Sequence, residues 1–251
     1  KGTYRRALDI KADELDGRRH ILYFDGAMSE AQIFVNGEKV CFWPYGYNSF
    51  HCDVTAQLKE GSNDITVLLE NREQSSRWYP GAGLYRKVRH ITQPQVHVPV
   101  WGTYVTTPHI GKEHAVVSVR TKIEGVEKGS AVTLKTRILD AGGHAVACVT
   151  DTRLLHFGEI EQTLTVENPT LWSPEDPVMY FVETEVYTGG SVDTDWDMDR
   201  PEISIADGTV PCDKVSTRFG FRTIEIIPDK GFFLNGEPRK FRGVCLHHDL
   251  G

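Results

Sequence analysis

Short apolar runs alternate with turn signals along residues 1–93, and no convincing helical period appears there. Ile65, Val67 and Leu69 repeat with a period of two, which is typical of a strand with one buried face. This pattern predicts an all-β unit. Its clearest strands are expected at residues 21–24, 31–35, 40–42, 65–69 and 84–91.

Turn residues indicate how these strands connect. Asn36-Gly37 is the dipeptide that best supplies the positive φ angles of a tight hairpin, so it is expected to join two strands. An aromatic loop and an Asp53-Val54-Thr55 turn follow. This order predicts a closed jelly-roll β-sandwich.

A second β pattern begins after a boundary near Gln93-Pro94. Six short strands at near-regular spacing predict an immunoglobulin-like β-sandwich. It is not a true immunoglobulin domain, because the Cys-Trp-Cys spacing is missing. The strands are expected at residues 96–105, 115–123, 131–139, 145–149, 162–166 and 180–186.

Residues 231–251 predict the opening of a third element. Asn235-Gly236 indicates a hairpin turn, and an apolar strand is expected through Phe241, Val244 and Leu246. That strand runs into His247-His248-Asp249. Titratable side chains after a first strand are what a (β/α) barrel places at its active-site mouth.

Composition describes an ordinary globular chain of 251 residues, with 39% hydrophobic and 25% charged residues and a net charge of -7. The 28 Lys and Arg are scattered, which argues against nucleic acid or an anionic membrane as a partner. No apolar run approaches the ~20 residues that span a bilayer. The chain starts without Met and in the middle of a predicted strand, so we expect an excised or processed chain.

The five cysteines are odd in number and contain no close pair, which favours free thiols over a disulfide framework. A Cys41–Cys52 bridge across neighbouring strands remains an alternative. Cysteine usage leaves open whether the protein works in the cytoplasm or the periplasm.

Two loops offer groups that could contact a sugar. Residues 75–86, SSRWYPGAGLYR, combine a tight Pro-Gly loop with the cation of Arg77 and the rings of Trp78 and Tyr79. Residues 43–50, WPYGYNSF, form a second aromatic cluster. Each cluster has a structural alternative, because large aromatic side chains in a β-sandwich usually belong to its core.

No metal or cofactor is expected. His247 and His248 are adjacent on the predicted strand and point to opposite sides, so they do not readily share an ion. Alternating aspartates at 193–199 resemble a calcium loop but lack its Gly and Glu, and a charged loop is the more common explanation. The sequence contains no phosphate-binding Gly-rich loop, nucleophile elbow or CxxC motif.

Four motifs share a family resemblance: FVNGEKV at 34–40, RWYPGAGLYR at 77–86, NPTLWSPEDPVMY at 168–180 and FLNGEPRKFRGVCLHHDLG at 233–251. They resemble glycoside hydrolase family 2, and most closely its β-galactosidases. The resemblance implies three parts. These are a jelly-roll, galactose-binding-like domain at 1–93 that lacks its usual first strands, an immunoglobulin-like domain at 94–218, and at 219–251 the first strand or strands of a truncated TIM barrel.

The resemblance implies a retaining β-glycosidase that acts on a carbohydrate, most closely a β-galactoside. His247 matches a position beside the sugar, and Asp249 is a further candidate because it stands at the same strand end. Asn48 and Arg77 lie on loops that can reach the sugar. No catalytic residue is expected here, because after Asp229 only Glu237 and Asp249 carry carboxyls, and retention requires a carboxyl pair. A homo-oligomer of the full-length protein is compatible with this reading. The alternative is a non-catalytic carbohydrate-binding or scaffold pair of sandwiches.

Overall fold

The structure is a computed structural model that describes residues 1–251 except 75–80, 156–157, 189–204, 206–208 and 246–251. It is mainly β, with 57% of residues in strands and 3% in helix, which confirms the predicted fold class. In the described part of the chain, no helix is long and apolar enough to cross a membrane. The chain divides into two compact units, Lys1–Gln95 with Gly243–Gly251, and Val96–Arg242.

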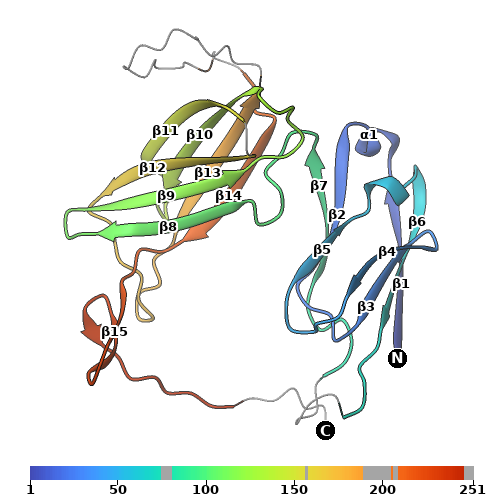
Figure 1. Cartoon of the computed structure of the whole chain (residues 1–251), viewed down its shortest axis with the longest axis horizontal. Helices are drawn as coiled ribbons and strands as arrows, with labels where there is room; N and C mark the ends of the chain where they lie inside the picture. The colour runs from blue at the N-terminus through green and yellow to red at the C-terminus, as the bar shows by residue number, and fades with distance from the viewer. Residues whose placement is uncertain (75–80, 156–157, 189–204, 206–208, 246–251) are drawn as a thin grey trace. The chain divides into compact units, whose positions relative to one another are not determined.

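The first unit contains two antiparallel sheets that face each other (Figure 1). One sheet has four strands in the order β1-β6-β3-β4, and the other has three in the order β5-β2-β7. The bounds are β1 Gly2–Ile10, β2 Arg18–Phe24, β3 Ala31–Val35, β4 Glu38–Trp43, β5 Phe50–Asp53, β6 Gly61–Leu69 and β7 Val88–Pro94.

The core of this unit lies between the two sheets. Ile33 and Val67 come from one sheet and Phe24 and Phe50 from the other, and all four are buried. The Phe24 and Phe50 rings stack with their centroids 4.7 Å apart. The period-two pattern of β6 is confirmed, because Ile65, Val67 and Leu69 all face this core.

The predicted hairpin turn at Asn36-Gly37 is confirmed. Asn36 has a φ of 51° and Gly37 a φ of 84°, and the turn joins β3 to β4. These are the left-handed angles that a two-residue hairpin turn requires.

The prediction of no helix in residues 1–93 was wrong at two short segments. Residues Ala12–Leu15 form helix α1, where the Lys11 backbone N–H donates to the Glu14 carboxylate at 2.8 Å. Residues Thr55–Gln57 form the 3-10 helix η1. Both are too short to show a helical period in the sequence.

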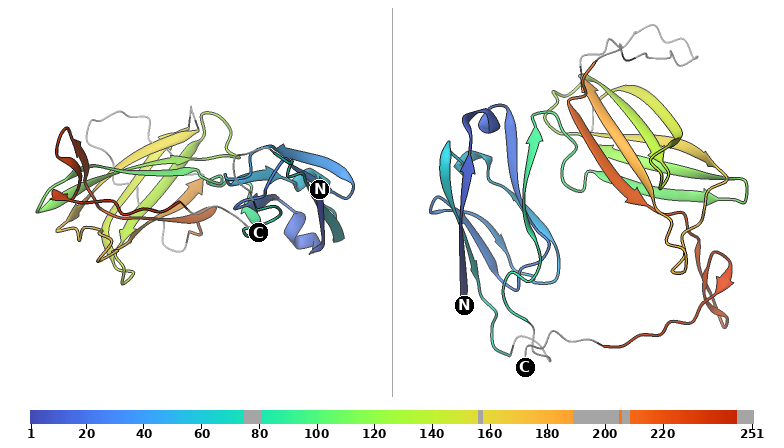
Figure 2. Two further views of the ribbon diagram at one scale, coloured as in Figure 1. Left: turned by 90° about the horizontal axis from the view of Figure 1, so that it is seen from below. Right: turned by 180° about the vertical axis from the view of Figure 1, so that it is seen from behind.

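The second unit also contains two facing antiparallel sheets (Figure 2). Their orders are β11-β10-β13-β14 and β12-β9-β8. The bounds are β8 Thr103–Ile110, β9 His114–Lys122, β10 Ala131–Leu139, β11 Ala145–Leu154, β12 Glu159–Glu167, β13 Tyr180–Thr188 and β14 Asp213–Phe219.

Apolar and polar side chains together fill the space between these sheets. Val117 and Leu164 face Ile138 and Val182 of the other sheet within one apolar cluster. Leu171 of the NPTLWSPEDPVMY motif packs against the same cluster. The Trp172 N–H donates to the carbonyl of Phe221 at 2.7 Å, which anchors the extended crossing.

A small three-stranded sheet follows, formed by β15 Ile224–Ile227, β16 Gly231–Leu234 and β17 Glu237–Pro238. Its turn is the predicted one, since Asn235 has a φ of 53° and Gly236 a φ of 78°. The Asn235 side chain receives a hydrogen bond from the Thr223 N–H at 3.0 Å and donates to the carbonyl of Trp172 at 3.0 Å. The turn is therefore tied to the second unit.

Some predicted strand bounds differ from the structure. The strand expected at 96–105 begins at Thr103, because the His97 and Val98 N–H groups bond instead to the Glu124 carbonyl and the Asp213 carboxylate. The strand expected at 84–91 runs Val88–Pro94, and the structure adds β1 and β5. Of the strand expected through 241–246, residues 241–245 have no regular structure, because no neighbouring strand pairs with them.

Candidate functional site

The loop that carries Asn48 joins β4 to β5 and is held by neighbouring loops of the first unit. The Tyr85 hydroxyl donates to the carbonyl of Gly46 at 2.8 Å. The Ser49 hydroxyl donates to the carbonyl of Asp25 at 3.1 Å. Asn48 itself is exposed in this loop, so its amide is available to a polar ligand.

The aromatic residues around this loop divide into two roles. Trp43 stacks on the buried Phe50 with ring centroids 5.5 Å apart, so these two rings serve the core, as the structural alternative predicted. Tyr45 is 53% exposed and lies 5.6 Å from Tyr47 between ring centroids. An exposed aromatic ring of this kind can receive the apolar face of a sugar.

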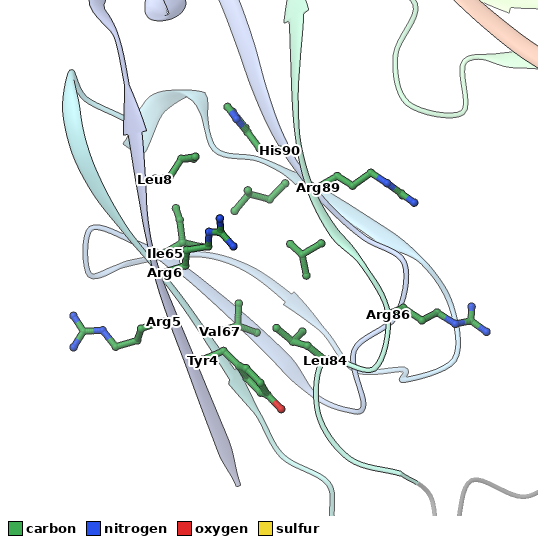
Figure 3. A pocket seen from close by; sticks show the side chains of 12 residues that line it. Tyr4, Arg5, Arg6, Leu8, Ile65, Val67, Leu84, Arg86, Arg89 and His90 are labelled. Carbon is green, nitrogen blue, oxygen red and sulfur yellow. The ribbon is translucent and has the colours of Figure 1, made fainter.

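A cavity of about 550 Å³ opens in the first unit between β1 and β7, the edge strands of its two sheets (Figure 3). Leu22, Ile65 and Val67 form its apolar floor. The inner face of β1 supplies Tyr4, Arg6 and Leu8, because residues at a spacing of two point to the same side of a strand. The remaining lining residues are Arg5, Leu84, Arg86, Val88, Arg89 and His90.

Four arginines border the cavity, but three of them have other neighbours. Arg5 pairs with Asp64 at 2.9 Å, and Arg89 pairs with Asp25 at 2.7 Å. Arg86 lies over the Tyr85 ring at 5.3 Å. Figure 3 shows these three side chains directed away from the cavity and Arg6 directed over it. Tyr4, Arg6 and His90 are the other polar side chains of the lining, and of the four arginines Arg6 alone is directed over the cavity.

His90 is the titratable ring of this cavity. Burial is the largest cause that lowers the pKa of His90, and the neighbouring His20 lowers it further. The ring is therefore neutral at neutral pH and can exchange a hydrogen bond without carrying charge.

The lining contains hydrogen-bond donors and no carboxylate. Donors above an apolar floor can bind hydroxyl or carboxylate groups of a ligand. A retaining glycosidase instead needs two carboxyl groups about 5 to 5.5 Å apart. Within the described residues, this lining therefore fits the binding of such groups.

The structure describes one of the four predicted sugar-contacting residues, Asn48, and places it on an exposed loop of the first unit. Arg77, His247 and Asp249 lie outside the described residues. The aspartates at 193–199 and Trp78 also lie outside them. Within the described ranges, no three His, Cys, Asp or Glu side chains are grouped so that they could hold a metal ion.

Tyr4, Arg6 and His90 are not among the site residues predicted from the sequence. A period-two signal was present, since Tyr4, Arg6, Leu8 and Ile10 alternate along β1. The alternation could have placed Arg6 on the inner face. It could not have shown that β1 and β7 border one cavity, because they are far apart in the chain.

Comparison with family models gives two successive matches. Residues 1–94 match the model described as glycosyl hydrolases family 2, sugar binding domain. Residues 96–198 match the model described as glycosyl hydrolases family 2.

Curated relatives match across the whole chain. A β-galactosidase of Bacteroides ovatus, BoGH2A, is 35% identical over 100% of this chain and 28% of its own length. A putative β-glucuronidase of Formosa agariphila is 33% identical over 100% of this chain and 22% of its own length. The chain thus spans between a fifth and a third of the length of these relatives.

Solved structures agree with these matches. A glycosyl hydrolase family 2 member from Bacteroides cellulosilyticus superposes with a TM-score of 0.83 at 32% identity, covering 98% of this chain and 32% of that one. A β-glycosidase from Bacteroides vulgatus superposes with a TM-score of 0.81 at 27% identity, covering 99% of this chain and 29% of that one. The consecutive family models, the relatives and the shared fold together show that this chain belongs to glycosyl hydrolases family 2.

Proposed function

We propose that this chain is the amino-terminal, non-catalytic part of a retaining glycoside hydrolase that cleaves terminal β-linked sugars, with β-galactosides as its substrates. The observation that carries the proposal is the pair of family matches, in succession over residues 1–94 and 96–198. The 35% identity to a β-galactosidase supports galactosides as the first choice of substrate. The 33% identity to a putative β-glucuronidase makes glucuronides the competing choice.

The proposed organisation has a jelly-roll sugar-binding domain at 1–93, an immunoglobulin-like domain at 94–218 and the entry to a catalytic barrel at 219–251. The separation of compact units between Gln95 and Val96 supports the first boundary. Exposed apolar side chains support the last part, since Ile226 is 80%, Phe241 78% and Val244 93% exposed. A further domain that packs on this segment would remove these side chains from water.

In this proposal, Asn48, Arg77, His247 and Asp249 bind the sugar, and the nucleophile and acid/base glutamates lie in the barrel beyond Gly251. The exposed position of Asn48 supports its role. Glu237 is exposed in β17 next to the hairpin turn. Retaining hydrolysis requires a pair of carboxyl groups, and this proposal places both catalytic glutamates in the barrel, so the chain by itself should not hydrolyse glycosides.

The test compares this chain with the product of the longest reading frame that contains it, on aryl β-galactosides and aryl β-glucuronides. We expect hydrolysis by the longer protein only, and faster on the galactoside. Faster hydrolysis of the glucuronide would keep the glycosidase and overturn the substrate. No hydrolysis of either class by the longer protein would overturn the proposal.

A non-catalytic carbohydrate-binding module is the second candidate, and the carboxylate-free cavity of the first unit favours it. Titration of this chain with galactose and with glucuronate, followed by tryptophan fluorescence, tests it. Arg6→Ala should weaken saturable binding, whereas Arg5→Ala should leave it unchanged because Arg5 pairs with Asp64 and points away. Equal effects of the two substitutions would overturn the cavity as the binding site.

A further inference from the structure

Cys41 and Cys52 lie on strands that face each other across the sandwich of the first unit. Cys41 belongs to β4 and Cys52 to β5, which are edge strands of opposite sheets. Two residues away in each strand, the rings of Trp43 and Phe50 stack at 5.5 Å with an angle of 14° between their planes. The two strands are joined by the loop at 44–49, so they run in opposite directions past each other.

This register brings the two thiols together. Side chains two residues apart share one face of a strand, so a Trp43–Phe50 contact between oppositely directed strands places Cys41 opposite Cys52. Cys52 is 8% exposed, and Cys41 is partly buried against the same apolar cluster. The two thiols interact closely enough that each shifts the pKa of the other.

The environment gives the two thiols different reactivity. The hydrogen bond from Cys52 and the nearby Lys39 ammonium lower the pKa of Cys41 to about 7. The hydrogen bond to Cys41 and burial raise the pKa of Cys52. Cys41 is thus the partly exposed thiolate and Cys52 the protonated thiol behind it, which is the arrangement of an attacking and a resolving cysteine.

We propose that Cys41 and Cys52 are a redox pair, which a low-molecular-weight disulfide converts into an intramolecular disulfide that ties β4 to β5 at the base of the Asn48 loop. Both thiols are free in this structure.

The reaction proceeds in two balanced exchanges. The Cys41 thiolate attacks one sulfur of the small disulfide, whose S–S bond breaks and releases one thiolate. Cys52 then loses its proton and attacks the Cys41 sulfur of the mixed disulfide, which releases the second thiolate. The two cysteines lose two electrons and two protons, and the small disulfide gains them as two thiols.

The bond would close a ring of 12 residues, from Cys41 to Cys52, that contains the whole Asn48 loop. Closing a ring restricts the unfolded chain more than the folded one. The oxidised protein should therefore unfold at a temperature higher by on the order of 5 °C.

The experiment treats the folded chain with oxidised glutathione near pH 7, blocks free thiols with iodoacetamide and maps the peptides without reduction. We expect one peptide pair joined through Cys41 and Cys52. Cys52→Ser should instead leave glutathione attached to Cys41. The matched control Cys148→Ser removes an exposed cysteine of the second unit and should leave the bridge unchanged.

The proposal is overturned if Cys41 and Cys52 are both recovered alkylated while exposed Cys148 or Cys245 carries glutathione. The same chain unfolded in urea before oxidation should give mixed pairings, because the register of β4 and β5 is then lost. An equal yield of the Cys41–Cys52 bond in urea would show that proximity in sequence, and not the fold, pairs these cysteines. The peptide maps of the folded and of the urea-unfolded native chain test the proposal even if a variant fails to fold.

Discussion

The imidazole rings of His20 and His90 stack with their centroids 5.0 Å apart and 9° between their planes, and His20 Nδ1 lies 2.8 Å from His90 Nε2. His20 Nε2 lies 2.9 Å from the carbonyl oxygen of Glu14, which can only accept. Nε2 of His20 therefore carries the proton, and Nδ1 of a neutral His20 accepts from His90 Nε2–H. This link joins β2 and β7, which are paired in one sheet, to helix α1.

The His20–His90 contact predicts that the chain loses stability in mild acid. Burial and His20 lower the folded-state pKa of His90, and the Glu14 carboxylate opposes this only in part. As the pH falls, His90 of the unfolded chain therefore binds a proton at a higher pH than His90 of the folded chain. The stabilisation is complete above the unfolded pKa of about 6.5 and is lost as the pH falls from there through the lower folded pKa. Urea unfolding of the native chain and of His90→Gln at pH values from about 8 to 5 measures this.

The native chain should lose its advantage over His90→Gln as the pH falls through this window. Subtracting the unfolding free energy of the variant at each pH removes the contribution of the groups that titrate alike in both proteins. Parallel stability curves for the two proteins would contradict the prediction.

Tyr85 is expected to stabilise the Asn48 loop through one hydrogen bond. Tyr85→Phe removes the 2.8 Å donation to the Gly46 carbonyl and should lower the free energy of unfolding by ~1 kcal/mol. Tyr104→Phe is the control, because that ring is exposed and lies beneath Arg120. Thermal unfolding measures both changes, and an equal shift from the two variants would count against the role of Tyr85.

The β3–β4 turn is expected to require glycine at position 37 because of its backbone angle, and not because a side chain would lack room there. A Cβ at this position would meet nothing within 4 Å, but the φ of 84° is one that side chains rarely adopt. Gly37→Ala should therefore cost ~1 kcal/mol, whereas Gly37→Asn should cost less because Asn tolerates left-handed angles. Denaturant unfolding of both variants measures the difference, and equal losses would show that conformation is not the cause.

Gln162 links the two sheets of the second unit through a buried polar contact. Its side-chain oxygen accepts from the Thr136 hydroxyl at 2.6 Å, and its amide donates to the Leu134 carbonyl at 3.3 Å. Gln162→Leu should cost ~1–3 kcal/mol, because the polar partners stay buried without it. The double variant with Thr136→Val should lose less than the sum of the two single variants. Additive losses, measured by chemical unfolding, would contradict this coupling.

The parts of the fold that were predicted correctly depend on local signals. The turns at Asn36-Gly37 and Asn235-Gly236 and the alternation along β6 were predicted because each depends on neighbouring residues. Helix α1 was missed because four residues give no period. The strand expected at 241–246 is not formed in the described residues 241–245, because backbone pairing needs a second strand that local sequence does not report.

The candidate site was less predictable. Asn48 was assigned because family 2 loops in this region can reach the sugar, and the structure locates it on an exposed loop. Its role and the roles of Arg77, His247 and Asp249 stay predictions. The cavity lined by Tyr4, Arg6 and His90 could not be predicted, since two edge strands distant in the chain border it.

The sequence by itself determined most of the strands, the hairpin turns and, through its motifs, the family, because side-chain alternation, backbone angles and motif residues are properties of short segments. Only the tertiary structure decided that Cys41 faces Cys52, that His20 stacks on His90 and that Arg6 alone among four arginines is directed over the cavity. These relationships depend on which strands become neighbours. That choice is made by burial of the two apolar faces against each other, which is a property of the whole unit and not of any segment.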